Sequence, residues 1–369
     1  MALVLLVALI MGGTAYRYSF AIPGLLLPVL FMRRTDLAFL SGLAVFFVLK
    51  IAASMLVEPG SEYGFYSLDY QWIARETGTI CLFFFWLLMG ERVLPLRRLT
   101  SLSWKVHAGA LIILFCLFYS YFGRIEIGTI DNLSALVLLL IYVLIIGPYG
   151  AAIRLCAVTV LVLTVLIPLE SSFAIISCFI LLGIYGFVLV GHQRLRLPWR
   201  LLTSMSIVVL VVMSQFAYLI DVRPVRSTGE GNNGYIRAAL AEAGYREIKD
   251  RPILGSPMGR GILPISIINE LKWEQYFEPG SGYDVFALSF HNSFIYLLAR
   301  YGICSFFLFF LLLKRIPRSG PAHAVLFTMT LVLGMGANVV IESLRSGPGV
   351  AFALGTLVAT ARPQRRLAS

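Results

Sequence analysis

The residues best suited to chemistry in this sequence lie between positions 221 and 291, where a long polar segment runs into an apolar one. The first half of the polar segment is rich in cationic side chains, and guanidinium groups bind phosphate or pyrophosphate oxygens without losing their charge. His291 follows at the junction, where a neutral imidazole can take up a proton near neutral pH. These residue types indicate a site that combines phosphate binding with general-base catalysis. The cations are Arg223, Arg226, Arg237, Arg246, Lys249, Arg251 and Arg260.

Each of these residues also has a structural interpretation. Any one arginine can be a solvated charge near lipid headgroups, His291 can hydrogen-bond locally, and Asn292 can cap the following helix. Arg237 is a stronger candidate because it falls within a predicted amphipathic helix over 235–249. Apolar side chains recur there at helical spacing, and we expect the helix to lie at the membrane interface. Arg260 is a stronger candidate because it lies between Gly259 and Gly261, and glycines permit a ligand to approach the backbone closely.

The sequence on both sides of this polar segment is apolar and predicts membrane-spanning helices. Of the 369 residues, 59% are hydrophobic and only 13% are charged, with a mean hydropathy of +0.86, whereas soluble domains carry about 25% charged residues. The sequence predicts an all-α polytopic membrane protein of about 12 transmembrane helices. We expect these spans near 1–15, 18–32, 36–57, 71–90, 105–122, 133–148, 150–168, 173–190, 201–219, 291–313, 321–341 and 348–361.

The distribution of charge predicts which side of the membrane each turn faces. Alternate turns hold arginine and lysine with almost no acid, as cytoplasmic turns do, while the other turns hold Glu58, Glu62, Asp69, Glu126, Asp131 and Glu170. The polar segment therefore falls on the outer side. We expect helices over 1–220, an outward-facing loop over 221–290, and the last helices with a short cytoplasmic tail over 291–369.

The net charge of +11 is explained by this asymmetry and by contact with anionic lipids, so it does not indicate a nucleic-acid partner. The cysteines all fall within predicted spans and have no metal-ligand spacing, which favours packing roles. They are Cys81, Cys116, Cys156, Cys178 and Cys304.

Three segments in this order resemble the O-antigen ligase and polymerase superfamily. They are Gly234–Arg237 (GYIR), Asp250–Gly255 (DRPILG) and His291–Ile303 (HNSFIYLLARYGI). The family shows an arginine on a loop helix, a proline–leucine–glycine turn, and a His-Asn-Ser sequence that begins the next helix. The resemblance covers about residues 234–313, and elsewhere it extends only to topology.

The resemblance implies a membrane glycosyltransferase of the C-type fold that acts on the periplasmic side of the bacterial inner membrane. Its donor would be a glycan on undecaprenyl pyrophosphate, and its acceptor a sugar hydroxyl. By position, His291 would be the base or would orient the acceptor, Arg237 would contact the pyrophosphate, and Asn292 would help bind substrate. The pyrophosphate is a good leaving group, so the chemistry requires no cofactor or metal in principle. A chain-length regulator and a flippase are expected partners of such an enzyme.

One departure from the family pattern concerns the phosphates. Many members carry a Ser-Arg-Gly sequence at the outer end of the helix two spans before the loop, whereas Glu170–Phe173 (ESSF) has no arginine here. Arg124, Arg260 and Arg345 are candidate substitutes. Arg345 lies on the same predicted face as the loop, although it could equally form a structural pair with Glu342.

Several functions remain open from the sequence. A polymerase would join lipid-linked repeat units into O-antigen or exopolysaccharide, and we favour it; a ligase would move the finished glycan to lipid A-core. A carboxylate-and-metal mechanism would use Glu58, Glu62 or Asp69. A flippase or transporter would use intramembrane charges such as Lys50 or the Arg75–Glu76 pair, but transporters usually place such groups at the midplane rather than in one large loop.

Overall fold

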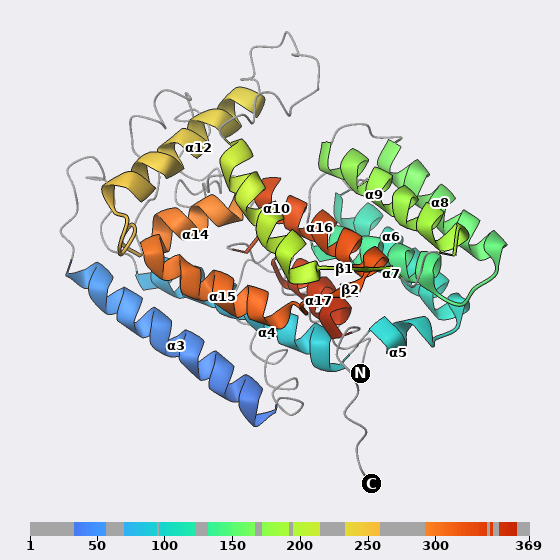
Figure 1. The fold of residues 1–369 in the computed structure, drawn as a ribbon, viewed down its shortest axis with the longest axis horizontal. Coiled ribbons are helices and arrows are strands. Elements are labelled where there is room, and N and C mark those ends of the chain that lie inside the picture. The colour runs from blue at the N-terminus through green and yellow to red at the C-terminus, as the bar shows by residue number, and fades with distance from the viewer. Residues whose placement is uncertain are drawn as a thin grey trace.

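The fold is given by a computed structural model that describes residues 33–56, 70–93, 96–122, 132–166, 172–191, 195–214, 233–258, 292–337, 340–341 and 347–359. These residues are mostly helical, and the helices pack side by side (Figure 1). The first half contains α3 (Arg34–Met55), α4 (Tyr70–Val93), α5 (Leu96–Thr100), α6 (Trp104–Phe122), α7 (Asn132–Ile146), α8 (Ala151–Leu166) and α9 (Ser172–Leu189). The second half contains α10 (Trp199–Met213), α12 (Asn233–Asp250), α14 (Ser293–Tyr301), η7 (Gly302–Cys304), α15 (Ser305–Arg315), α16 (Ala322–Ala337) and α17 (Gly347–Val358).

The predicted membrane spans correspond to helices wherever the structure describes them. Each predicted span from 36–57 onward contains a helix, while the spans 1–15 and 18–32 lie outside the described residues. Among the described residues, the segments Arg34–Met55 and Ser293–Arg315 are long and apolar enough to cross a membrane, and the other apolar helices are shorter. The protein is therefore an all-α membrane protein, and the total of about 12 helices stays a prediction.

Helix α17 forms the centre of the bundle. Every residue from Gly347 to Val358 is buried, and the helix packs closely against α4 (Figure 1). A Cβ added to Gly90 would lie 2.1 Å from the carbonyl oxygen of Phe352, and one added to Gly355 would lie 2.0 Å from that of Leu87. These two glycines let the helix backbones touch, because any larger side chain would force them apart.

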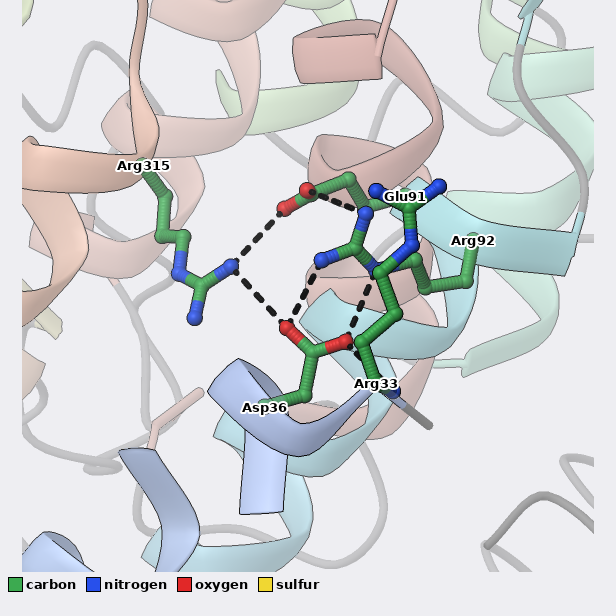
Figure 2. Close-up of polar contacts among 5 residues, drawn as sticks. All are labelled: Arg33, Asp36, Glu91, Arg92 and Arg315. Atoms are coloured by element: carbon green, nitrogen blue, oxygen red, sulfur yellow. Dashed lines mark hydrogen bonds and ion pairs between the residues drawn. The ribbon is translucent and has the colours of Figure 1, made fainter. Parts of the chain in front are cut away.

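A network of charged side chains joins α3, α4 and α15 at one end of these helices (Figure 2). Asp36, at the start of α3, is fully buried and accepts two hydrogen bonds of 2.8 Å from Arg92 on α4. Arg315, at the end of α15, places one guanidinium nitrogen 3.5 Å from Asp36 and 3.4 Å from Glu91. We call Asp36, Glu91, Arg92 and Arg315 the Asp36 network.

Neighbouring turns also contact one another. Strand β1 (Arg196–Leu197) pairs antiparallel with β2 (Gly320–Pro321), and the Arg200 guanidinium donates twice to the carbonyl of Ile316 at 2.9 and 2.8 Å. The sequence predicts that both turns, and the helix ends in the Asp36 network, face the cytoplasm. The contacts agree with that grouping, since turns predicted to share one side of the bilayer meet in space.

Candidate functional site

The polar loop predicted from sequence contains α12, which lies beside α14 (Figure 1). The helix spans Asn233–Asp250, so the amphipathic helix predicted over 235–249 is confirmed. Its apolar face is buried within the protein rather than left for the membrane interface. The buried residues include Leu240, Ala241, Ala243 and Glu247.

The two arginines of α12 fall on opposite faces of the helix. Arg246 is exposed and pairs with Glu242 at 2.6 Å. Arg237 precedes Leu240 and Ala241 by three and four residues, a spacing that puts three positions on one helix face. Position 237 is therefore in helical register with Leu240 and Ala241 and not with the exposed Arg246.

The segment after α12 makes a tight turn over residues 251–258 that fits against the junction of α14 and η7. Gly255 has φ +67°, and a Cβ there would lie 2.5 Å from the carbonyl oxygen of Arg300. Gly302 has φ +55°, and a Cβ there would lie 2.6 Å from the carbonyl oxygen of Pro252. Both positions require glycine, because the positive φ and the close approach each exclude a side chain.

Backbone hydrogen bonds then join this turn to the helix. The Ser256 amide donates to the carbonyl of Ala299 at 2.8 Å, and the Ile303 amide donates to the carbonyl of Pro252 at 2.8 Å. The predicted span 291–313 corresponds to the apolar segment Ser293–Arg315. These bonds explain a local feature within it: α14 ends at Tyr301 and a 3₁₀ turn precedes α15. The amide of Ile303 is used by the turn instead of by its own helix.

Lys50 anchors the same turn to α3. Its ammonium group is buried with the rest of the side chain, and it donates to the carbonyl of Ser256 at 3.0 Å and to that of Leu254. The ring of Tyr301 lies 5.8 Å from the ammonium nitrogen. The cation is thus held by carbonyl dipoles and an aromatic ring, which compensate for its removal from water.

The buried face of α3 shows why Lys50 points inward. Leu43, Phe47, Lys50 and Ser54 are all buried, and their spacing places them on one side of the helix. Ser54 lies one turn beyond Lys50, and its hydroxyl accepts from the amide of Met258 at 3.0 Å. Lys50 and Ser54, two polar side chains on an otherwise apolar face, therefore bind the turn between Leu254 and Met258.

Arg300 of α14 binds the turn from the other side. Its guanidinium donates to the carbonyl of Pro257 and forms an ion pair with Glu76 of α4 at 2.5 Å. The hydroxyl of Tyr296 donates to the same carboxylate at 3.4 Å. Arg300 is 2% exposed and Glu76 is 12% exposed, so the pair sits in a low-dielectric environment where removal of either partner is costly.

Glu247 of α12 completes this group of buried charges. Its carboxylate accepts a hydrogen bond from the Ser256 hydroxyl. Burial raises the pKa of Glu247 above its ordinary value, while the Ser256 hydroxyl and the charges of Arg251 and Arg300 act in the opposite direction. We call Lys50, Glu76, Glu247 and Arg300 the Lys50–Arg300 cluster.

The start of α14 is fixed by a separate set of contacts. The Asn292 side chain caps the helix, because its oxygen accepts from the amides of Phe294 and Ile295 at 2.9 and 3.2 Å. Its amide nitrogen donates to the carbonyl of Leu210 at the end of α10 at 3.4 Å. The capping interpretation of Asn292 is thus confirmed, and its predicted substrate contact stays a prediction.

Two further contacts show what surrounds this helix start. The Ser293 hydroxyl accepts from the amides of Val340 and Ile341 at 2.9 and 3.1 Å, so the chain that leads toward Arg345 passes beside α14. The Tyr245 hydroxyl of α12 donates to the carbonyl of Val211. The end of α10, the middle of α12, the start of α14 and residues 340–341 therefore meet at one place.

The remaining predicted site residues lie outside the described residues. They are His291, Arg260, Arg124 and Arg345, the alternative carboxylates Glu58, Glu62 and Asp69, and Glu170, the first residue of the segment that differs from the family's Ser-Arg-Gly sequence. Arg237 is described only through its helix backbone. Among the described residues, no three His, Cys, Asp or Glu side chains gather in a group that could hold a metal ion.

Sequence reasoning found part of the Lys50–Arg300 cluster and missed the rest. The sequence predicts Lys50 and Glu76 as intramembrane charges. It predicts no role for Arg300, which lies within the motif His291–Ile303, or for Glu247. A usable signal exists for Glu247: it lies on the helix face marked by Leu240, Ala243 and Gly244. A carboxylate at that register predicts a buried partner.

These features define an all-α membrane protein in which an arginine-bearing loop helix is docked onto the bundle by buried charges. A comparison with protein families then matches residues 157–310 to the O-antigen ligase family, which confirms the resemblance to the O-antigen ligase and polymerase superfamily. The matched segment contains Arg237, Arg260, His291 and Asn292. No curated protein and no solved structure matches the chain.

Proposed function

We propose that this protein is a membrane glycosyltransferase that polymerises oligosaccharide repeat units carried on undecaprenyl pyrophosphate, on the periplasmic side of the bacterial inner membrane. The observation that carries the proposal is the meeting of α12 and the start of α14 at the end of α10. Arg237 lies on the first element in register with Leu240 and Ala241, and His291 immediately precedes the second. The match to the O-antigen ligase family over 157–310 supports the same class of reaction.

In the proposed reaction His291 takes the proton from a sugar hydroxyl of the acceptor as that oxygen attacks the anomeric carbon of the donor. The bond from the anomeric carbon to the pyrophosphate oxygen breaks, and direct displacement inverts the configuration of the sugar. Negative charge grows on the departing lipid pyrophosphate. Arg237 stabilises that charge with a preorganised guanidinium group, which costs no reorganisation during the reaction.

The second phosphate-binding cation is proposed to be Arg345, with Arg260 and Arg124 as the other candidates. Support for Arg345 comes from Ser293, because its hydroxyl binds the amides of Val340 and Ile341 four to five residues before that arginine.

A ligase that transfers the finished glycan to lipid A-core is the second candidate function, because the matching family is described as O-antigen ligase. The two differ in the acceptor. A polymerase forms a ladder of products from the lipid-linked repeat unit alone, whereas a ligase needs lipid A-core. The transporter alternative is less favoured, since Lys50 binds the carbonyls of Leu254 and Ser256 and has a structural explanation.

The test is an assay with purified protein in lipid vesicles and a lipid-pyrophosphate repeat unit, in the presence and absence of lipid A-core. We expect a product ladder without any other acceptor, and loss of product with His291→Ala. Arg237→Ala should lower kcat/KM about 100-fold, as removal of one charge-stabilising donor typically does. Arg246→Ala is the matched control on the exposed face of α12 and should retain wild-type activity. Full activity of His291→Ala would refute the mechanism.

A further inference from the structure

The 251–258 turn is held by side chains from both neighbouring helices through its backbone carbonyls and amides. Lys50 binds the carbonyls of Leu254 and Ser256, and Arg300 binds the carbonyl of Pro257. Ser54 accepts from the amide of Met258. The turn follows α12 directly, since the amide of its first residue, Arg251, still donates to the backbone carbonyl of Glu247 at 3.0 Å. Any movement of the turn therefore moves the end of α12.

We infer that Lys50, with Arg300, is a positioning residue that sets the place of α12, and hence of Arg237, relative to the start of α14. This inference rests on the proposed function and names a residue outside the segment that matches the family, because Lys50 lies in α3 and the match begins at residue 157. In this role Lys50 acts through the turn that it holds.

The contacts of α14 make the expected effect selective. The start of α14 is fixed by the Asn292 cap and by Ser293, which binds residues 340–341, and neither contact involves Lys50. Loosening the turn should therefore displace the arginine that holds the donor while leaving the acceptor side of the site in place. Donor recognition and acceptor recognition should separate in the kinetics.

The variants are Lys50→Met, which removes the donors and keeps the length, and Lys50→Arg, which keeps the donors. Ser54→Ala is a milder change that removes the acceptor for the Met258 amide and the hydroxyl bond to the carbonyl of Lys50. Asp36→Asn is the matched control, because it perturbs the opposite end of the same helix without touching the turn. Each protein is compared as the full chain in lipid vesicles.

We expect Lys50→Met to lower kcat/KM for the donor about 100-fold, the loss typical of a small misplacement of a binding group. The KM for the acceptor should stay unchanged. Lys50→Arg should recover most of the loss, Ser54→Ala should show a smaller donor effect, and Asp36→Asn should show none. An unchanged donor KM in Lys50→Met, or equal changes in donor and acceptor KM, would overturn the inference.

Hydrogen exchange separates this inference from the proposed function. The amides of Gly255, Ser256 and Met258 are hydrogen-bonded in the folded protein, and Lys50→Met should speed their exchange while Asp36→Asn leaves it unchanged. If the wild-type protein transfers no glycan, the proposed function fails. Unchanged hydrogen exchange in Lys50→Met would overturn the positioning role whether or not glycan is transferred.

Discussion

The Asp36 network and the Lys50–Arg300 cluster join the same three segments, α3, α4 and the α14–α15 pair, at opposite ends. In the Asp36 network the carboxylates and guanidinium groups bind each other (Figure 2). In the Lys50–Arg300 cluster two of the charges, Lys50 and Arg300, bind backbone carbonyls of a turn that belongs to the loop. The first arrangement closes the helix bundle, and the second docks the loop onto it.

The difference teaches that similar buried charges can serve different purposes. A carboxylate bound by two guanidinium groups fixes helix ends through side chains, so a change there should affect how firmly the bundle holds together. A cation bound to the carbonyls of Leu254 and Ser256 fixes the path of a loop. We therefore expect substitutions in either network to lower stability, and only substitutions in the Lys50–Arg300 cluster to impair donor recognition.

The largest effect is expected from Arg300→Met in the Lys50–Arg300 cluster. The change leaves the Glu76 carboxylate without its cation in a buried position, and breaking such a pair costs about 3–5 kcal/mol. We expect a lower thermal unfolding temperature in detergent and loss of activity per folded molecule. Adding Glu76→Leu should restore part of the stability, because it removes the uncompensated charge, but should not restore activity. A variant as stable and active as wild type would contradict this account of the cluster.

The next effect is expected from Asp36→Asn in the Asp36 network. The amide keeps the shape of the side chain but weakens the charge-assisted bonds from Arg92, each worth about 1.5–3 kcal/mol. Thermal unfolding should shift downward, while activity per folded molecule stays at the wild-type level. Loss of specific activity comparable to that of Arg300→Met would erase the proposed distinction between the two ends of the bundle.

The smallest effect is expected from Glu247→Gln. Because burial raises the pKa of this carboxyl above its ordinary 4.5, the folded protein holds the proton more tightly than the unfolded chain does. Its contribution to stability is present below pH 4.5 and is lost as the pH rises through the folded pKa. Glutamine stays neutral, so the variant should gain stability relative to wild type as the pH rises. A difference in unfolding temperature that is constant with pH would argue against this.

The local elements of the site were predictable because their signals are short-range. The helical spacing over 235–249 predicts α12, and the prolines and glycines after Asp250 predict its end. Both agree with the structure, in which α12 spans Asn233–Asp250 and the chain then turns. The apolar runs predict the membrane helices for the same reason, since each run reflects the burial requirement of its own segment.

The partners of the charges were not predictable because they are distant in sequence. Lys50 binds residues more than 200 positions away, and no local pattern specifies that contact. The 3₁₀ turn within the predicted span 291–313 has the same origin. The local sequence predicts one apolar helix, whereas Gly302 has φ +55° at the point where the 251–258 turn approaches it closely.

The sequence by itself determined that this is a helical membrane protein, where its apolar segments lie, and which motifs resemble the O-antigen ligase and polymerase superfamily. Composition, periodicity and short motifs carry that information, and each acts over a few turns of helix. The tertiary structure decided that Asn292 serves as a cap and that Lys50 and Arg300 hold the turn. Those outcomes depend on which segments meet, because a buried charge is stable only beside a partner that the fold supplies.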